Sequence, residues 1–289
     1  MTACPVCETD LDFFAPARVL GHVEASYMLC PKCGVVALAN PSWLDEAYSD
    51  AISSLDVGLL SRCARLSGFT AQVIRAQRLC GGIFLDWAGG YGTLTRLMRD
   101  RGYDFRHDDP LCANIFARGH EAGPEPASYA LATAFEVFEH LPDPADALQS
   151  IASSTDFLLF TTHLLPAPTP RPDQWWYYTP ETGQHITFYT LRSLALLADR
   201  LGFELLSDGV SQHLFARGPV TSATRFLLSP QRRALHAGTA RVRAAAASAF
   251  RRGPASRPLD VGWTEVGTGP DGVRHQAEAA FDDAAGDML

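Results

Sequence analysis

The sequence predicts an α/β protein whose core is a mostly parallel, doubly wound sheet. Three segments are interpreted as its strands, namely residues 82–87, residues 103–110 and the apolar first part of residues 129–144, which runs into a short Glu-His turn. The first is followed by Leu94, Leu97 and Met98 at helical spacing. Because strands that alternate with helices favour a parallel sheet, this pattern sets the fold class. We expect a small module before this core and a helical or disordered extension after it.

Residues 1–40 carry two Cys-x-x-Cys knuckles, formed by Cys4, Cys7, Cys30 and Cys33, with 22 residues between them. Two facing knuckles bring four thiolates together at the tetrahedral geometry that Zn²⁺ prefers, so we expect a structural zinc ribbon. Disulfides and a redox motif are the competing interpretations. No basic, apolar leader precedes the cysteines, and a thioredoxin-like motif is single and lies beside a βαβ unit, so both are disfavoured.

Residues 41–78 show helical patterning and are interpreted as a lead-in to the core, which we place at residues 79–217. The first core strand runs into the turn Asp86-Trp87-Ala88-Gly89-Gly90-Tyr91-Gly92. Glycine lets the backbone adopt a positive φ and lets a ligand lie against the main chain without meeting a Cβ. A nucleotide-like cofactor is therefore expected at this turn.

The turn lacks residues that two common nucleotide-binding motifs require, and this limits which cofactor it can bind. A dinucleotide fingerprint needs a third glycine where this chain has Thr95, which disfavours NAD. The lysine and hydroxyl residue of a P-loop are also missing, which disfavours ATP and GTP. What remains is a ligand with a ribose and an amino-acid end but no phosphate.

The turn resembles motif I of the class I S-adenosylmethionine (SAM) methyltransferases, an acidic residue followed by Gly-x-Gly-x-Gly. Asp86, Gly90 and Gly92 match, and Ala88 replaces the first glycine. About twenty residues later the second strand ends in Asp108 and Asp109, a spacing at which an acid can accept ribose hydroxyls. Asp109 is the first candidate and Asp108 the second.

A third match follows the strand that ends near Phe135. Glu139-His140-Leu141-Pro142-Asp143-Pro144 is similar to a segment that many methyltransferases of this class carry after the fourth strand. The resemblance implies a Rossmann-like, SAM-binding methyltransferase core. It implies cofactor contacts from Asp86, Ala88, Gly89, Gly90, Gly92, Asp108, Asp109, Phe135, Glu136 and, from a lead-in helix over the site, Tyr48. Tyr48 could equally be an aromatic residue that packs on the sheet.

Candidate catalytic groups follow the predicted strands, where an open α/β sheet binds its ligands. Methyl transfer needs an acceptor held in line and, for some acceptors, a base, and histidine has a suitable pKa. His140, His163 and His185 lie in such positions. A proline-stiffened loop carries Trp175, Trp176 and Tyr177, and we expect these aromatic residues and His163 to border the substrate.

This loop resembles a segment of SAM methyltransferases that act in surface-polysaccharide and sugar-modifying pathways. By that resemblance His185 is the first candidate for the base and His140 the second. Either histidine could instead be a hydrogen-bonded residue that shapes the pocket.

Residues 218–289 are expected to form an Ala/Arg-rich helical extension and an acidic tail. No acidic residue falls between Asp208 and Asp260, while nine arginines do, from Arg217 to Arg257. This stretch is interpreted as a solvated helix, with a surface for an anionic partner as the alternative. The net charge of −8 disfavours nucleic acid, and no apolar run approaches the ~18 residues of a membrane span, so a cytoplasmic protein is expected.

The expected function is SAM-dependent methyl transfer to a small molecule, with a sugar or glycan hydroxyl or carbon as the acceptor. An RNA methyltransferase is one alternative, because some of these enzymes also carry an N-terminal zinc module. A non-catalytic scaffold is the other, and Ala88 in place of glycine is its support. The acceptor atom and the oligomeric state stay open.

Overall fold

The structure is a computed structural model that describes residues 3–49, 56–123 and 128–235. A compact unit spans Met1–Arg232 and contains every element described below. Most of the predicted Arg-rich stretch and all of the predicted acidic tail lie outside the described residues. Within the described part of the chain, no helix has both the length and the apolar character needed to cross a membrane.

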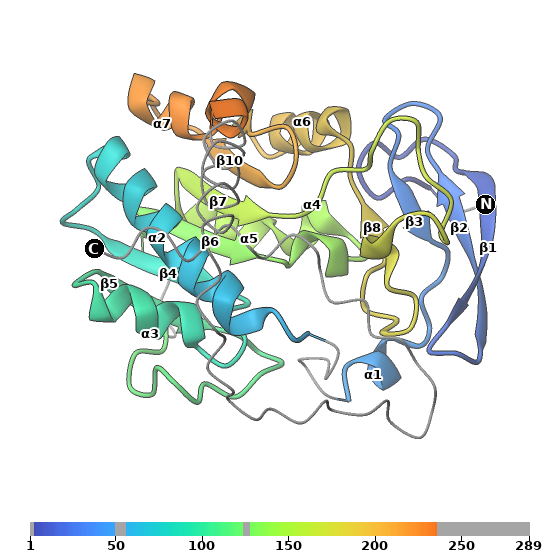
Figure 1. The fold of residues 1–289 in the computed structure, drawn as a ribbon, viewed down its shortest axis with the longest axis horizontal. Coiled ribbons are helices and arrows are strands. Elements are labelled where there is room, and N and C mark those ends of the chain that lie inside the picture. Colours follow the sequence, from blue (N-terminus) through green and yellow to red (C-terminus); the bar gives the residue numbers. More distant parts are fainter. Residues whose placement is uncertain (1–2, 50–55, 124–127, 236–289) are drawn as a thin grey trace, which may run out of the picture. The chain divides into compact units, whose positions relative to one another are not determined.

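The core is a six-stranded sheet in the order β5-β4-β6-β7-β10-β9 (Figure 1). Its strands are β4 (Ile83–Trp87), β5 (Asp104–Asp108), β6 (Leu131–Phe135), β7 (Phe157–Thr161), β9 (Glu204–Ser207) and β10 (Gln212–Ala216). The first four in this order run parallel, and β10 is antiparallel to both of its neighbours. The predicted mostly parallel α/β fold is thus confirmed.

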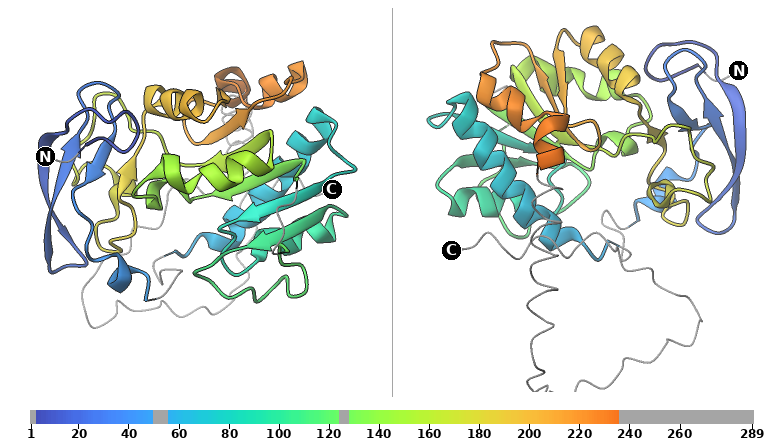
Figure 2. Two further views of the ribbon diagram at one scale, coloured as in Figure 1. Left: turned by 180° about the vertical axis from the view of Figure 1, so that it is seen from behind. Right: turned by 45° about the horizontal axis from the view of Figure 1, so that its top comes forward.

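Each face of this sheet is covered by helices, as a doubly wound sheet requires. Adjacent strand residues point to opposite faces, so Phe84 and Leu159 lie in one apolar cluster while Leu85 and Leu158 lie in the other. The first cluster is completed by α2 (Leu59–Gln77), α3 (Thr93–Asp100) and residues at the end of α7 (Ser222–Leu227). The second is completed by α4 (Pro144–Ala147), α5 (Gln149–Ser154) and α6 (Leu191–Arg200), and the views of Figure 2 show both layers.

The N-terminal residues form a second, antiparallel sheet in the order β1-β2-β3-β8, from β1 (Asp12–Val19), β2 (Val23–Leu29), β3 (Val36–Leu38) and β8 (Thr187–Phe188). Its last strand therefore comes from the loop that follows β7. The Leu38 amide donates to the Ile186 carbonyl over 2.8 Å, which extends this pairing. Short helix α1 (Leu44–Ala47) then leads away from the ribbon (Figure 1).

Candidate functional site

The turn after β4 is built around a buried carboxylate. Asp86 is 2% exposed, and its two oxygens accept hydrogen bonds from the Thr95 and Thr133 hydroxyls, each over 2.9 Å. A Cβ on Gly89 would lie 2.7 Å from Asp86 Oδ2, so only glycine fits there. Burial raises the pKa of Asp86. Asp86 therefore ties the turn to α3 and β6, and its oxygens already have partners.

Three residues of this turn have a left-handed backbone. Ala88, Gly90 and Gly92 have φ of +52°, +58° and +80°. Gly92 precedes α3, and a Cβ there would collide with the side chain of Asn114. Ala88 adopts the same region despite its side chain, which is strained for an L-residue. The backbone thus forms a small-residue cradle at the carboxyl end of β4, as a bound SAM would require.

The end of β5 is joined to this cradle. The Gly90 amide donates to Asp109 Oδ2 over 2.8 Å, and Asp109 Oδ1 accepts from the amides of Leu111 and Cys112. Asp108 is exposed, and its backbone carbonyl accepts from the Ala88 amide. His107 Nε2 donates to the Gly90 carbonyl over 2.8 Å. Of the two candidate carboxylates, that of Asp109 contacts the glycine turn, while Asp108 contacts it through its backbone carbonyl.

The end of β6 adds a second strained residue at the same edge of the sheet. Glu136 follows Phe135 and has a φ of +56°. Its amide donates to Thr161 Oγ1 over 3.0 Å, and the Thr161 hydroxyl donates to its carboxylate over 2.6 Å. Non-glycine residues in this backbone region concentrate at functional sites.

A cluster of polar side chains follows β6. The 3₁₀ helix η1 (Phe138–His140) carries Glu139 and His140, and the loop before β8 carries His185. The two histidine rings lie 4.9 Å apart between centroids and nearly perpendicular. Glu139 is fully buried, and the Tyr177 hydroxyl donates to its Oε1 over 2.6 Å. The two histidines predicted as candidate bases are thus neighbours.

Backbone carbonyls identify the neutral tautomer of both histidines. His140 Nδ1 lies 3.0 Å from the Gln184 carbonyl, and His185 Nδ1 lies 2.8 Å from the Tyr177 carbonyl. A carbonyl can only accept, so each Nδ1 carries a proton, and in the neutral form of each ring Nε2 is the nitrogen with a lone pair. Burial and the neighbouring His185 lower the pKa of His140 to about 3, so that His140 stays neutral.

Tyr48 links the lead-in segment to this cluster. It ends α1, and its hydroxyl lies 2.9 Å from His140 Nδ1. Burial, Glu139 and Asp109 together raise the pKa of Tyr48, because both carboxylates oppose a phenolate there. Tyr48 thus contacts His140 and lies within the electrostatic influence of Asp109 and Glu139.

The four N-terminal cysteines also come together. The Sγ atoms of Cys4 and Cys33, and those of Cys7 and Cys30, are 3.5 Å apart, and all four sulfurs lie within 4.8 Å of one another. Tetrahedral Zn–S bonds of ~2.3 Å place sulfurs ~3.8 Å apart, so this set fits a zinc ion with little movement. The Thr190 hydroxyl donates to the Cys33 carbonyl over 2.7 Å and fixes the knuckle to the start of α6.

Comparison with known families decides the class of the core. A family model described as a methyltransferase domain matches residues 62–208, just over half of the chain. The chain belongs to this methyltransferase family. No curated protein matches the sequence.

Solved structures resemble this methyltransferase at low sequence identity. TnmH has 17% identity and a TM-score of 0.45, and mitomycin 7-O-methyltransferase MmcR has 14% and 0.45; each match covers 61% of both chains. An O-methyltransferase family 2 protein from Planctomyces limnophilus, in complex with apigenin, has 18% identity and a TM-score of 0.42, with 60% of this chain and 66% of that chain covered. The methyltransferase thus spans less than two thirds of the length of these proteins.

The aromatic residues predicted to border the substrate of the methyltransferase contact histidines and also the apolar cluster of the ribbon. Tyr177 contacts the rings of His163 and His185, at 4.8 and 4.7 Å between centroids. Trp176 is 56% exposed and lies 5.1 Å from the His163 ring. Trp175 packs on Tyr177, Tyr178 and Phe188, in the apolar cluster of the ribbon, to which Tyr177 also belongs. Tyr177 is therefore the residue that contacts His185, while Trp176 and His163 pack against Tyr177.

Sequence reasoning missed three supporting residues of the methyltransferase site, namely Glu139, His107 and Thr133. Glu139 was visible as the acid directly before His140, but its burial depends on Tyr177, 38 residues further along the chain. Thr133 and His107 stand opposite Asp86 in the sheet register. Alternation along the strands could have placed the last two beside Asp86, had the register been known.

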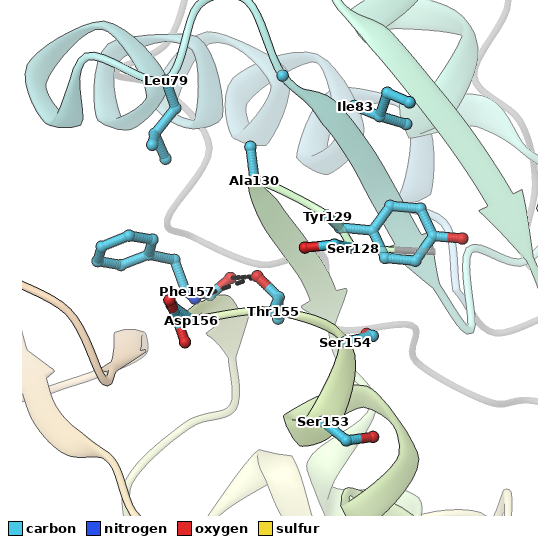
Figure 3. A pocket seen from close by; sticks show the side chains of 11 residues that line it. Leu79, Ile83, Ser128, Tyr129, Ala130, Ser153, Ser154, Thr155, Asp156 and Phe157 are labelled. Carbon is cyan, nitrogen blue, oxygen red and sulfur yellow. Dashed lines mark hydrogen bonds between the residues drawn. The ribbon is translucent and has the colours of Figure 1, made fainter. Parts of the chain in front are cut away.

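A cavity of about 440 Å³ lies at the opposite edge of the sheet (Figure 3). Its lining includes Leu79, Ile83, Tyr129 and Phe157, at the amino ends of the strands. The nearby hydroxyls of Ser153 and Ser154 donate to carbonyls of their own helix. An open α/β sheet binds ligands at its carboxyl edge, so we assign the methyltransferase site to the other side.

Proposed function

We propose that this methyltransferase uses SAM to methylate a small-molecule acceptor, with a sugar or glycan hydroxyl or carbon as the first candidate. One observation carries the proposal. The glycine turn, Asp109 and His140 follow the carboxyl ends of neighbouring parallel strands, and His185, from the loop before β8, lies beside His140. A cofactor cradle and groups able to handle a proton are thus placed at one edge of the sheet.

In this proposal the turn from Ala88 to Gly92 holds the cofactor against bare backbone, and Asp109 accepts the ribose hydroxyls, with Asp108 as the second candidate. Phe135 and Glu136 border the cofactor from β6, and Tyr48 covers it. Asp86 supports the turn through Thr95 and Thr133. When bound, SAM supplies an electrophilic sulfonium methyl group, so the chain itself must orient the acceptor and manage its proton.

The two bare Nε2 atoms can act on an acceptor hydroxyl in two ways. His185 can accept its proton as a base, with His140 as the second candidate. Alternatively, both can hold a cation that lowers the pKa of the hydroxyl. Trp176, Tyr177 and His163 would border the acceptor, because aromatic faces pack well on sugar rings. The choice of a sugar rests on the resemblance of the loop at residues 163–189.

The four-cysteine cluster is proposed to hold a structural Zn²⁺. Four thiolates fill a tetrahedral site and leave no position for substrate. Because those thiols must remain reduced to bind the ion, we place the protein in the cytoplasm. We propose that residues 1–40 form the zinc ribbon and that residues 79–217 form the SAM-binding core.

Calorimetric titration of the full chain with SAM, and then with S-adenosylhomocysteine, tests the cofactor assignment. We expect saturable binding of both ligands with one site per chain. No heat of binding at millimolar SAM would instead favour a non-catalytic scaffold. Mass spectrometry of small molecules that co-purify with the chain, followed by a methyl-transfer assay on them, then tests the acceptor class. An RNA acceptor would show itself as binding that weakens with salt.

A further inference from the structure

The cluster of Glu139, His140 and His185 has the donor set of a metal site. We propose that these three residues bind a divalent first-row transition-metal ion. A carboxylate oxygen and one ring nitrogen from each histidine lie within 4.8 Å of one another. Two of the ligands come from η1, and the third comes from the loop two residues before β8.

In each histidine, the ring nitrogen that would not bind the ion makes the hydrogen bond that is typical of a metal-bound histidine. A metal-bound histidine usually donates its other ring N–H to a carbonyl or carboxylate, which fixes the ring and its tautomer. Here the Nδ1–H groups of His140 and His185 donate to the carbonyls of Gln184 and Tyr177. Each ring is therefore held in place with its Nε2 lone pair available. Both histidines are half-buried residues.

Glu139 supplies an independent observation. Its carboxylate is fully buried; Oε1 accepts from Tyr177, but Oε2 has no hydrogen-bond partner. A buried carboxylate without compensation is costly. Among the described residues, no lysine or arginine forms an ion pair with it. A cation between Glu139 and the two neutral rings would supply the missing charge.

The donor set distinguishes this site from the cysteine cluster. Two imidazoles and one carboxylate, with positions left open, suit catalytic transition-metal ions, whereas four thiolates suit structural zinc. An acceptor hydroxyl at an open position would have its pKa lowered by the ion. The inference deepens the proposed function and rests on it for this role. The Nε2 lone pair of His185 cannot bind an ion and accept a proton at the same time. If His185 is a metal ligand, it is therefore not the base.

Metal stoichiometry tests the site without an activity assay. The full chain is equilibrated with Zn²⁺ alone, dialysed and measured for zinc per chain. We expect two equivalents for the wild type and one for either Glu139→Gln or His185→Gln. Cys30→Ser should also lose one equivalent, and combining it with Glu139→Gln should lose both. His163→Gln, a nearby histidine outside the three ligands, should keep two.

The proposal is overturned if Glu139→Gln and His185→Gln keep the wild-type zinc count, or if the wild type holds a single equivalent that Cys30→Ser removes. SAM titration of each variant separates this result from the proposed function. Unchanged SAM affinity shows that the variants are folded and that the cofactor assignment stands whatever the metal count. Loss of SAM binding by the wild type would remove the proposed function but not the metal site.

Discussion

The backbone amide of Gly90 donates a hydrogen bond to Oδ2 of Asp109 over 2.8 Å. This bond joins the turn after β4 to the turn after β5, although the two residues belong to different strand–turn units. The side chain that we assign to the ribose is therefore already oriented by the cradle that would hold the rest of the cofactor. Preorganisation of this kind favours binding, because less freedom is lost when the ligand arrives.

Replacing Asp109 tests this assignment. Asp109→Ala should weaken SAM binding by about 1.5–3 kcal/mol, or about 10- to 150-fold in Kd, because a charged acceptor of hydrogen bonds is lost. Asp108→Ala tests the second candidate in parallel, since it removes an exposed carboxylate from the adjacent position. Calorimetry on both variants gives the comparison, and the same affinity for wild type and Asp109→Ala would show that another group binds the ribose.

Ala88 provides a test of backbone strain in the turn. A left-handed φ is unfavourable for alanine by about 1–2 kcal/mol, whereas glycine adopts it freely. Ala88→Gly should therefore raise the free energy of unfolding by about 0.5–1 kcal/mol, after the greater entropy of unfolded glycine is subtracted.

The control for Ala88 is Ala71→Gly in α2, where the backbone is helical. That change should lower the free energy of unfolding by about 1 kcal/mol. Denaturant unfolding measures both variants. A loss of stability in both would show that the turn does not strain Ala88.

His213 predicts a pH dependence of stability. It is fully buried on β10, with Nε2 donating to the Thr162 carbonyl and Nδ1 accepting from Ser207. Burial lowers its pKa from 6.5 to about 4, while Asp208 and Glu136 oppose the shift and His163 adds to it. Between these two values the unfolded state binds more protons. The free energy of unfolding should therefore fall as the pH falls, by up to ~3 kcal/mol in total.

His213→Gln isolates this effect from other titrating groups, because His140 also has a lowered pKa and contributes in the same range. Thermal unfolding from pH 7 to pH 4 should show a shallower decline for the variant than for the wild type. Parallel curves would mean that His213 is protonated in the folded state without penalty.

Removal of zinc from the ribbon should destabilise it. Cys30→Ser should lose one zinc equivalent and unfold the ribbon, because the ion binds the folded and not the unfolded arrangement of thiolates. Cys80→Ser, at an exposed cysteine outside the cluster, should keep the metal and the stability of the wild type. Metal analysis and thermal unfolding of both variants make the comparison; a zinc-free ribbon with native stability would contradict it.

His185→Gln should lower kcat by about 10²–10⁴-fold, whether the residue acts as a base or as a metal ligand. Its KM for SAM should stay near the wild-type value, since the ring lies in the loop before β8 and not in the glycine turn. Steady-state kinetics at several pH values provide the measurement. Equal kcat for variant and wild type would reduce His185 to a residue that shapes the pocket.

The sequence was informative where function depends on local chain geometry. The glycine turn, the acids after β5 and the paired cysteines are each contained within a few residues, so spacing alone could place them. It was less informative where partners are distant. Both oxygens of Asp86 are taken by Thr95 and Thr133, and Glu139 is paired with Tyr177, and such contacts follow only from sheet register and loop packing. Direct cofactor contact by Asp86 stays a prediction.

The aromatic loop shows the same limit. Trp175 and Tyr177 contact each other and the same apolar cluster, but only Tyr177 also contacts a histidine of the candidate site. The sequence predicted that these aromatic residues border the substrate, and it could not predict their packing on the ribbon. The sequence did not show whether residues 121–127 form a strand; the structure has a single bridge between His107 and Glu121 there, and residues 124–127 lie outside the described part of the chain.

The position of β8 in the loop after β7 has a consequence for biosynthesis. The first three ribbon strands are synthesised by residue 38, but their fourth partner begins at Thr187. Translation of the intervening segment takes on the order of ten seconds, during which the edge of β3 is uncovered and open to pairing with other nascent chains. Early loading of the cysteine knuckles with metal would be one way for the growing polypeptide to pass through that interval without aggregating.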